Sequence, residues 1–333
     1  MTREDSRKSK SILKIDEVLD RIKTHPEYSV IVLRETAIAI RDESNLHSLA
    51  LEKEDNPEHG KHPKEERRKG VQQLNRALSH LSTLGISVGS LSPLGHTIEP
   101  EENNFRSYRK TQVLFGGFTP PSADTLLYHM DQLVAILEYT DEHPITRALQ
   151  AHIEMVKIHP YEDGNGRAAR LLQNFCLQQR GYPAAVIPLS DRELYLSLLG
   201  GALEDRYDHT SSLENPSEKE TLFRQFIISK VLASSEKLEE QLSARRIYDV
   251  TLSHFDHPGA IYSVAKTIRG LGRREGRQGV SVHIDPANGR KSTNRLRIVG
   301  DVGLRELKSY LNRTTAKYGL QYRVNPVDTM QRK

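Results

Sequence analysis

Apolar residues recur at helical spacing along most of the chain up to about residue 245. They repeat every three or four positions, the spacing that lines one face of an α-helix. Pro144 suits the first turn of such a helix, because its missing N–H is not needed there. The segments with this spacing are 13–51, 71–81, 123–139, 144–156 and 168–180. The pattern predicts that residues 13–245 are mainly helical.

Three stretches interrupt the helical pattern. Residues 52–69 are dense in charge, and residues 84–104 are rich in Gly, Ser and Pro, so we expect both to be surface loops. In the third, Val113 to Phe115 form a short strand-like run that Gly-Gly and then Pro-Pro close. Ser122 can cap the helix that follows.

After about residue 246 the pattern becomes the alternation of strands. Residues 279–285, 295–301 and 318–324 alternate apolar and polar positions, and a helical stretch, 302–318, lies between the last two. This predicts a small α+β domain. Residues 264–276, followed by a hairpin, would also suit a diverged winged helix.

These patterns predict a mainly α fold followed by a small basic α+β domain. The expected parts are an N-terminal helical region (1–105), a core (106–215), a linking helix (216–245) and the α+β accessory domain (246–333).

Charge is unevenly divided between these parts. Residues 241–333 contain 18 Lys and Arg and 7 Asp and Glu, a net charge of +11. The remainder contains 30 basic and 37 acidic residues, a net charge of −7. We therefore expect the C-terminal domain to meet its own partner, either nucleic acid or an acidic protein.

Composition excludes several classes of protein. The single cysteine, Cys176, excludes an internal disulfide and a cysteine-rich zinc site. No apolar run is long enough to cross a membrane, and the first residues lack the apolar core of a signal peptide. The sequence therefore predicts no membrane partner and a cytoplasmic location.

The most informative stretch is HPYEDGNGRAAR, which runs from His159 to Arg170. Gly164 and Gly166 allow a tight turn and a close approach of the backbone to a ligand. The helix that follows offers its first N–H groups to an anion. Arg167 and Arg170 lie three residues apart, so both can reach the same polyphosphate.

Two further residues of this stretch add chemistry. Asp163 beside a polyphosphate suits Mg²⁺, and His159 can take a proton near neutral pH. The combination indicates transfer from a nucleoside triphosphate to a hydroxyl group. It is not a P-loop, because no Gly-Lys-Ser/Thr follows the glycines.

This stretch resembles the signature of the Fic family, His-Pro-Phe-x-(Asp/Glu)-Gly-Asn-Gly-Arg-x-x-Arg. The only departure is Tyr161 for the usual Phe, which keeps an aromatic anchor but needs a place for its hydroxyl. The likeness covers roughly residues 30–215 and includes the β-hairpin flap of that family, a helical bundle fold. It does not include the basic C-terminal part.

The resemblance implies a role for each matching residue. His159 would be the general base, Asp163 would bind Mg²⁺, and Tyr195 would lie near the nucleotide. The anion nest would consist of Gly164, Asn165 and Gly166, with Arg167 and Arg170 on the phosphates. The flap edge that docks the target would be Thr111, Gln112, Val113, Leu114 and Phe115.

Members of the family mostly move AMP from ATP to a Ser, Thr or Tyr hydroxyl of a target protein. Many also carry an inhibitory helix with the pattern (Ser/Thr)-x-x-x-Glu-(Gly/Asn), whose glutamate faces the second motif arginine. Glu43 lies at the matching distance, although Ala39 and Ser44 replace the flanking residues of the pattern. Glu214 fits the pattern literally in TSSLEN (210–215), but after the core. We expect Glu43 to be the regulatory residue.

Two classes of function remain open from the sequence. The first is a protein adenylyltransferase that uses ATP and Mg²⁺, or a related enzyme that transfers another nucleotide or a phosphate group. The second is a nucleic-acid-binding regulator whose Fic-like core senses nucleotide. The intact motif with His159 favours the enzyme, because a sensor does not need a general base. The sequence leaves open whether the chain forms a homodimer.

Overall fold

The computed structural model describes residues 3–24, 30–53, 63–100, 106–139, 142–212, 214–243, 246–253, 260–274, 281–285, 293–300 and 302–327. Internal contacts divide the chain into two compact units. The first comprises Met1–Lys23 and Arg34–Leu238, and the second comprises Thr24–Leu33 and Glu239–Lys333. The N-terminal helices and the core therefore form one unit.

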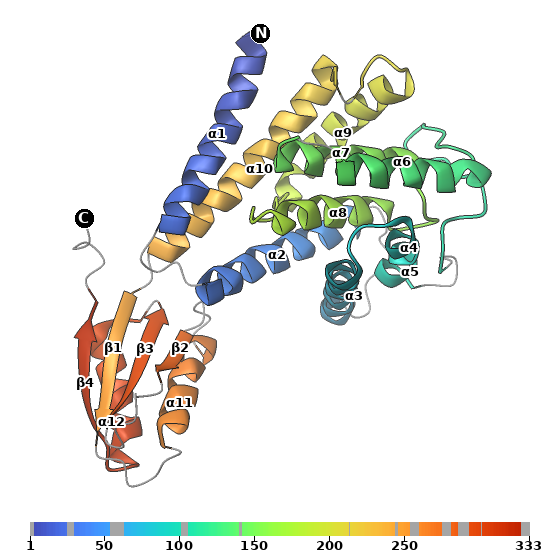
Figure 1. Cartoon of the computed structure of the whole chain (residues 1–333). Helices are drawn as coiled ribbons and strands as arrows, with labels where there is room; N and C mark the ends of the chain where they lie inside the picture. Colours follow the sequence, from blue (N-terminus) through green and yellow to red (C-terminus); the bar gives the residue numbers. More distant parts are fainter. Residues whose placement is uncertain are drawn as a thin grey trace. The chain divides into compact units, whose positions relative to one another are not determined.

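The first unit is built from helices (Figure 1). They are α1 (Arg3–Thr24), α2 (Val30–Lys53), α3 (Pro63–Leu84), α4 (Val88–Leu91), α5 (Leu94–Ile98), α6 (Leu126–Tyr139), α7 (Pro144–Ile158), α8 (Asn165–Gln179), α9 (Arg192–Tyr207) and most of α10 (Glu218–Ser243). No helix in the described ranges is long and apolar enough to cross a membrane. The mainly helical fold is confirmed.

Helices α7 and α8 form the centre of this unit. α7 begins at Pro144, and the Nδ1 of His143 accepts a hydrogen bond from the first turn. α8 is buried at every position from Arg167 to Leu177, so other elements surround it. The short loop from His159 to Gly164 joins the two helices and lies at the end of α7 and the start of α8.

Both expected surface loops are partly helical. In the charged stretch, helix α3 begins at Pro63, because Lys, Glu and Arg favour helices and Pro suits the first turn. In 84–104, Ser87 and Ser90 form a capping box at α4, and Leu91, Leu94 and Ile98 are at most 1% exposed. The Gly, Ser and Pro content there reflects caps and close packing rather than a surface loop.

The expected hairpin flap is present but short. Phe115 and Phe118 pair as an isolated antiparallel bridge, with hydrogen bonds of 3.3 and 2.8 Å between their backbone groups. Gly116 and Gly117 between them both have positive φ, as a tight two-residue hairpin turn requires. Of the predicted strand from Val113 to Phe115, only Phe115 pairs.

The second unit contains a four-stranded antiparallel sheet. Its elements are β1 (Arg246–Ser253), α11 (Ala260–Arg274), β2 (Ser281–Asp285), β3 (Thr293–Gly300), α12 (Leu304–Ala316) and β4 (Gln321–Pro326). The strand order is β2-β3-β1-β4, which is the split βαβ arrangement of ferredoxin-like folds. The expected α+β domain is confirmed, whereas the winged-helix alternative is wrong.

One face of this sheet packs against both helices. Buried residues of β1 and β3, such as Val250 and Leu296, form a core with Val264 and Ile268 of α11 and Leu307 of α12. The residues between these inward positions belong to the opposite face of the sheet.

Candidate functional site

His159 ends α7 in the left-handed conformation, with φ of 51°. Such a conformation costs energy for a non-glycine residue, so the surrounding structure must maintain it. The His159 N–H donates to Met155 O at 3.1 Å, and the Nε of Arg109 donates to His159 O at 2.8 Å. The backbone of His159 is thus fixed on both sides.

The imidazole ring of His159 is also fixed. Its Nδ1 lies 3.3 Å from Val156 O, and because a carbonyl only accepts, Nδ1 carries the proton. The basic nitrogen is therefore Nε2. The ring stacks on Phe115 of the flap, with 3.9 Å between ring centroids and 13° between planes. The flap therefore orients the candidate base directly.

Arg109 links the flap to the loop after α7. It is 2% exposed, and it donates to three backbone carbonyls, two of which lie at the two ends of the flap. Nη1 donates to Thr111 O at 2.7 Å, Nη2 donates to Pro121 O, and Nε donates to His159 O. The N–H of Arg109 donates to Pro160 O at 2.8 Å. Sequence reasoning missed this residue.

Asn165 holds the glycine loop in shape. Its Oδ1 accepts from Tyr161 N at 3.0 Å and its Nδ2 donates to Tyr161 O at 2.8 Å. Asn165 is 3% exposed, so its side chain supports the loop rather than reaching into solvent. Gly164, with φ of 82°, precedes the first turn of α8.

The hydroxyl of Tyr161, the one departure from the motif, has a defined partner. It donates to Leu91 O at 2.6 Å, and the residue is fully buried. Gly95 of α5 lies so close that an added Cβ would come within 2.5 Å of the Tyr161 ring. The short helices α4 and α5 therefore form the seat of this ring.

Arg167 and Asp163 lie together at the start of α8. Arg167 Nη1 pairs with Glu99 Oε2 at 2.5 Å, and its Nη2 lies 3.5 Å from Asp163 Oδ2. The Arg167 side chain is 7% exposed, whereas that of Asp163 is 65% exposed. Among the described residues, no group of three or more His, Cys, Asp or Glu side chains could hold a metal ion. A metal at Asp163 would need ligands from substrate or water.

Arg170 begins a chain of buried hydrogen bonds. Its Nη1 donates to Tyr195 OH at 3.3 Å, and Tyr195 OH lies 3.0 Å from His152 Nε2. His152 Nδ1 in turn lies 2.6 Å from Gln173 Oε1, which accepts. Burial lowers the pKa of His152 to about 3, so the ring is neutral and accepts from Tyr195. Tyr195 is 1% exposed, so its hydroxyl holds Arg170 from within the core.

The other donors of Arg170 go to helix α2. Its Nε donates to Ser48 Oγ at 2.8 Å and its Nη2 donates to Ser48 O at 3.0 Å. Ser44, one turn earlier, donates to Ala185 O at 3.0 Å and accepts from Asn174 of α8. Two serines thus hold α2 against the central helix.

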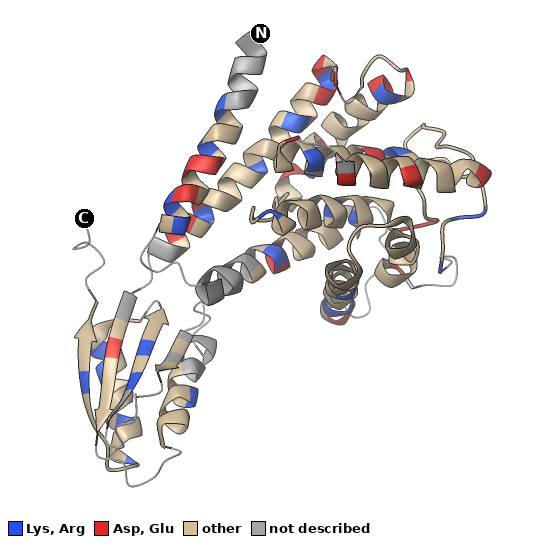
Figure 2. Ribbon diagram, viewed as in Figure 1, with Lys and Arg blue, Asp and Glu red and all other residues tan. Residues whose placement is uncertain are grey.

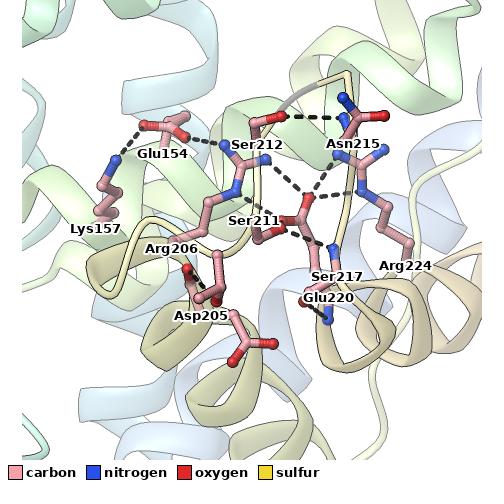
Figure 3. Close-up of polar contacts among 11 residues, drawn as sticks. Glu154, Lys157, Asp205, Arg206, Ser211, Ser212, Asn215, Ser217, Glu220 and Arg224 are labelled. Atoms are coloured by element: carbon pink, nitrogen blue, oxygen red, sulfur yellow. Dashed lines mark hydrogen bonds and ion pairs between the residues drawn. The ribbon is translucent and has the colours of Figure 1, made fainter.

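A buried ion network joins α7 to α9 and α10 (Figure 3). Arg206 donates to both oxygens of Glu220, at 2.6 and 2.8 Å, and to Glu154 of α7 at 3.0 Å. Burial alone would raise the pKa of the Glu220 carboxyl, but hydrogen bonds from Arg206 and Ser211 and the charge of Arg224 outweigh it, so the pKa is lowered. Glu220 therefore stays ionised and fixes α9 and α10 relative to α7.

Residues 91–177 match the Fic/DOC family. The chain carries a Fic domain. The match includes the whole of HPYEDGNGRAAR and the flap, and it ends within α8.

Curated relatives agree with this assignment. The chain is 39% identical over 132 residues to the protein adenylyltransferase Fic of Drosophila grimshawi, over 39% of this chain and 26% of the relative. It is also 39% identical over 114 residues to the protein of the same name from Culex quinquefasciatus, over 33% of this chain and 22% of the relative. The chain therefore spans about a quarter of the length of these relatives.

Solved Fic structures share the fold. A Fic domain-containing signalling protein from Bacteroides thetaiotaomicron superposes with a TM-score of 0.55 at 22% identity, over 69% of this chain and 98% of the other. A Fic family protein from Desulfovibrio desulfuricans gives 0.56 at 18% identity, over 91% and 98% of the two chains. At these identities the likeness concerns the fold alone.

Glu43, the expected regulatory residue, contacts helix α10 in this structure. Its carboxylate pairs with Lys237 Nζ of α10 at 2.5 Å, while Ser48 holds Arg170. Glu43 therefore faces α10. The alternative, Glu214, is exposed and lines a cavity of about 400 Å³ together with Lys157 and Arg206.

A second match to the pattern was missed in the sequence. Ser48-Leu-Ala-Leu-Glu52 meets (Ser/Thr)-x-x-x-Glu, with Lys53 in place of Gly or Asn. The side chain of Glu52 lies outside the part of the chain that the structure describes. The literal spacing from Ser48 could have identified this glutamate.

Proposed function

We propose that this chain transfers AMP from ATP to a Ser, Thr or Tyr hydroxyl of a target protein. One observation carries the proposal: the His159 ring is oriented by Val156 and Phe115 so that Nε2 is its basic nitrogen. The names of the curated Fic relatives support the same reaction. A nucleotide sensor would not need an oriented base.

In this reaction, Nε2 of His159 takes the proton of the target hydroxyl. The hydroxyl oxygen then forms a bond to the α-phosphorus, while the bond from that phosphorus to the oxygen bridging to the β-phosphate breaks. Pyrophosphate leaves with the bonding electrons. The ordered loop of Tyr161 to Asn165 would keep the phosphorus within reach of the attacking oxygen.

The phosphates would lie at the N-terminus of α8. Its first N–H groups, after Gly164, attract anions through their unpaired donors and the helix dipole. Arg167 and Arg170 add guanidinium groups one helical turn apart. Arg170 would have to exchange part of its contact with Ser48 for the triphosphate.

Asp163 is the residue that fits Mg²⁺. Its carboxylate is exposed beside the helix N-terminus, and Mg²⁺ is commonly bound by one or two carboxylates together with phosphate oxygens and water. When bound there, Mg²⁺ neutralises charge on the triphosphate. Asp163 would also compete with the phosphates for Arg167, because its Oδ2 lies 3.5 Å from Nη2.

The target would dock on the flap as an added strand. The edge from Thr111 to Phe115 includes Leu114, which is 74% exposed. Backbone pairing with such an edge fixes the position of the hydroxyl without reading much sequence. The stacking of Phe115 on His159 connects this docking edge to the base.

Helix α2 is the proposed brake on the reaction. Ser48 holds Arg170 through both its hydroxyl and its carbonyl, and Glu52 follows one turn later. A carboxylate of this helix that reached Arg170 would compete with the γ-phosphate for the guanidinium and repel that phosphate. Glu43 remains the proposed regulatory residue, and Glu52 is the alternative that the spacing from Ser48 supplies.

Intact-mass analysis tests the reaction. The purified chain is incubated with Mg²⁺ and, separately, with ATP, GTP, UTP and CTP, together with a mixture of candidate target proteins. A mass increase equal to AMP with ATP alone supports the proposal. An increase equal to UMP, GMP or a phosphate group would assign the related transfer instead, and no covalent change in any protein would favour the sensor.

A further inference from the structure

The C-terminal unit has a sheet face that its own helices leave uncovered. Helices α11 and α12 pack on the side of Val250, Leu296 and Ile298 (Figure 1). The opposite side carries the alternate residues of the same strands. We call this side the open face. Its described residues are Asp249, Thr251, Ser253, Arg295, Arg297, Val299, Gln321, Arg323 and Asn325.

Three arginines lie on the open face, two on β3 and one on β4. In the register of the sheet, Thr251 of β1 lies between Arg295 of β3 and Arg323 of β4. The two arginines are therefore separated by two strand spacings, about 10 Å. Arg297 lies two residues from Arg295 on β3, about 7 Å along the strand. Figure 2 shows the basic positions on β3 and β4 with an acidic one on β1 between them.

The three arginines differ in their partners. Arg297 forms a two-bond pair with Asp249, with distances of 2.8 and 3.0 Å, in which both side chains remain partly exposed. Both Arg295 and Arg323 are exposed, and neither forms an ion pair with a residue whose side chain the structure describes; Asp285, opposite Arg295 in the register, is not among those residues. Two exposed guanidiniums on one face of the sheet can therefore meet an anionic partner.

The remaining residues of the open face indicate the class of partner. Thr251, Ser253, Gln321 and Asn325 are hydrogen-bonding side chains, and the one apolar residue described, Val299, is only 4% exposed. Protein interfaces generally contain an apolar centre, and the described residues of this face include no exposed apolar side chain. Arginines with hydroxyl and amide groups instead match phosphates and base edges, and the net charge of +11 over residues 241–333 attracts a polyanion.

We propose that the open face binds single-stranded RNA. A single strand can lie across the four strands and bring both phosphates and bases to Arg295 and Arg323, whose planar groups can stack on bases. A duplex is a convex cylinder that would meet a flat sheet along one line. The hydroxyl and amide groups also supply acceptors for the 2′-OH, which DNA lacks.

Fluorescence anisotropy with the full chain tests this proposal. The probe is a fluorescein-labelled oligouridylate at about 50 mM salt, a concentration at which phosphate contacts are strong. Reversing both charges with Arg295→Glu and Arg323→Glu should raise Kd by about tenfold or more. The salt slope should fall by about 1.4, since each lost phosphate contact on a single strand contributes about 0.7.

Lys266→Glu with Lys308→Glu is the matched control. Both lysines are exposed on the helical side of the unit, and the pair produces the same change in net charge. It should change Kd by less than about threefold, because neither lysine belongs to the open face and salt weakens the interaction of exposed charges that do not touch the bound strand. Arg295→Gln with Arg323→Gln should weaken binding in the same direction as the charge reversal. Thermal melting of every variant checks that the unit is folded.

Three results would overturn the proposal: no binding by the parent chain, an equal loss in the lysine control, or tighter binding of oligothymidylate than of oligouridylate. The assay contains no nucleoside triphosphate, so its outcome is independent of adenylyl transfer.

Discussion

Replacing Tyr161 by the Phe that Fic motifs usually have should destabilise this protein. The Tyr161 hydroxyl donates to Leu91 O at 2.6 Å, and both residues have 0% exposure. Tyr161→Phe removes the donor and leaves a buried carbonyl without that bond. A change of this kind costs about 1–2 kcal/mol of folding free energy. For a unit of this size, that corresponds to a fall in Tm of about 2–8 °C.

Catalysis should be affected much less than stability. Asn165 holds the backbone N–H and carbonyl of Tyr161, and neither bond involves the ring. The loop should therefore keep its shape, and adenylyl transfer at 25 °C should stay within about threefold of the parent, since misplacement of the loop is what would lower the rate.

The assay is urea unfolding followed by circular dichroism, with Tyr128→Phe as the control. Tyr128 belongs to α6 and is 62% exposed, so the same chemical change should leave its midpoint unaltered. Burial raises the pKa of Tyr161 well above its ordinary value, so its stabilisation is fully present below the unfolded pKa of about 10 and declines above it. The difference between Tyr161→Phe and the parent should thus be constant from neutral pH to about pH 9. A variant as stable as the parent would refute the anchoring role of the hydroxyl.

Three other predictions concern the base, the brake and a buried histidine. His159→Ala should lower transfer by about a hundred- to ten-thousand-fold while calorimetry still detects ATP binding, and near-normal transfer would remove His159 from the mechanism. Glu43→Gly should raise transfer, whereas Glu214→Gly after the core should not; an unchanged rate for Glu43→Gly with activation by Glu52→Gly would move the role to Glu52. Because burial lowers the pKa of His152 to about 3, the unfolded chain binds its proton first, and stability should fall as pH drops from about 6.5 towards 3. Urea midpoints across that range should fall less steeply for His152→Gln, and equal slopes would contradict the assignment.

The sequence predicted the part of the site whose residues follow one another closely along the chain. His159, Asp163 and Arg170 occupy one short segment, and the glycine spacing alone indicates a turn into a helix. Arg109 and Ser48 were not identified, because they act on distant residues. Arg109 contacts three backbone carbonyls, and every residue has a carbonyl, so no side-chain pattern marks its partners.

The sequence correctly predicted the helices that have long periodic apolar faces. It wrongly predicted a surface loop at 84–104, where the structure has the short helices α4 and α5. Gly95 suggests a loop when only local preference is considered, yet it is there because the ring of Tyr161 leaves no room for a Cβ. In the second unit, strand β1 alternates in the expected way, with Tyr248, Val250 and Leu252 buried. One alternating segment does not reveal its neighbours, so the order of the sheet required the structure.

The attachment of the flap by Arg109 has a consequence for recognition of the target. A loop that becomes ordered only on binding loses conformational entropy at that moment, which weakens the complex. Here one buried guanidinium ties both ends of the flap to the loop that carries His159, so most of this ordering is completed during folding. In the proposed reaction, a target segment would therefore meet a prearranged edge and would need few contacts of its own to be held. An enzyme that works in the proposed way could modify a substrate during a brief encounter, and selection among proteins would then depend on surfaces away from the acceptor hydroxyl.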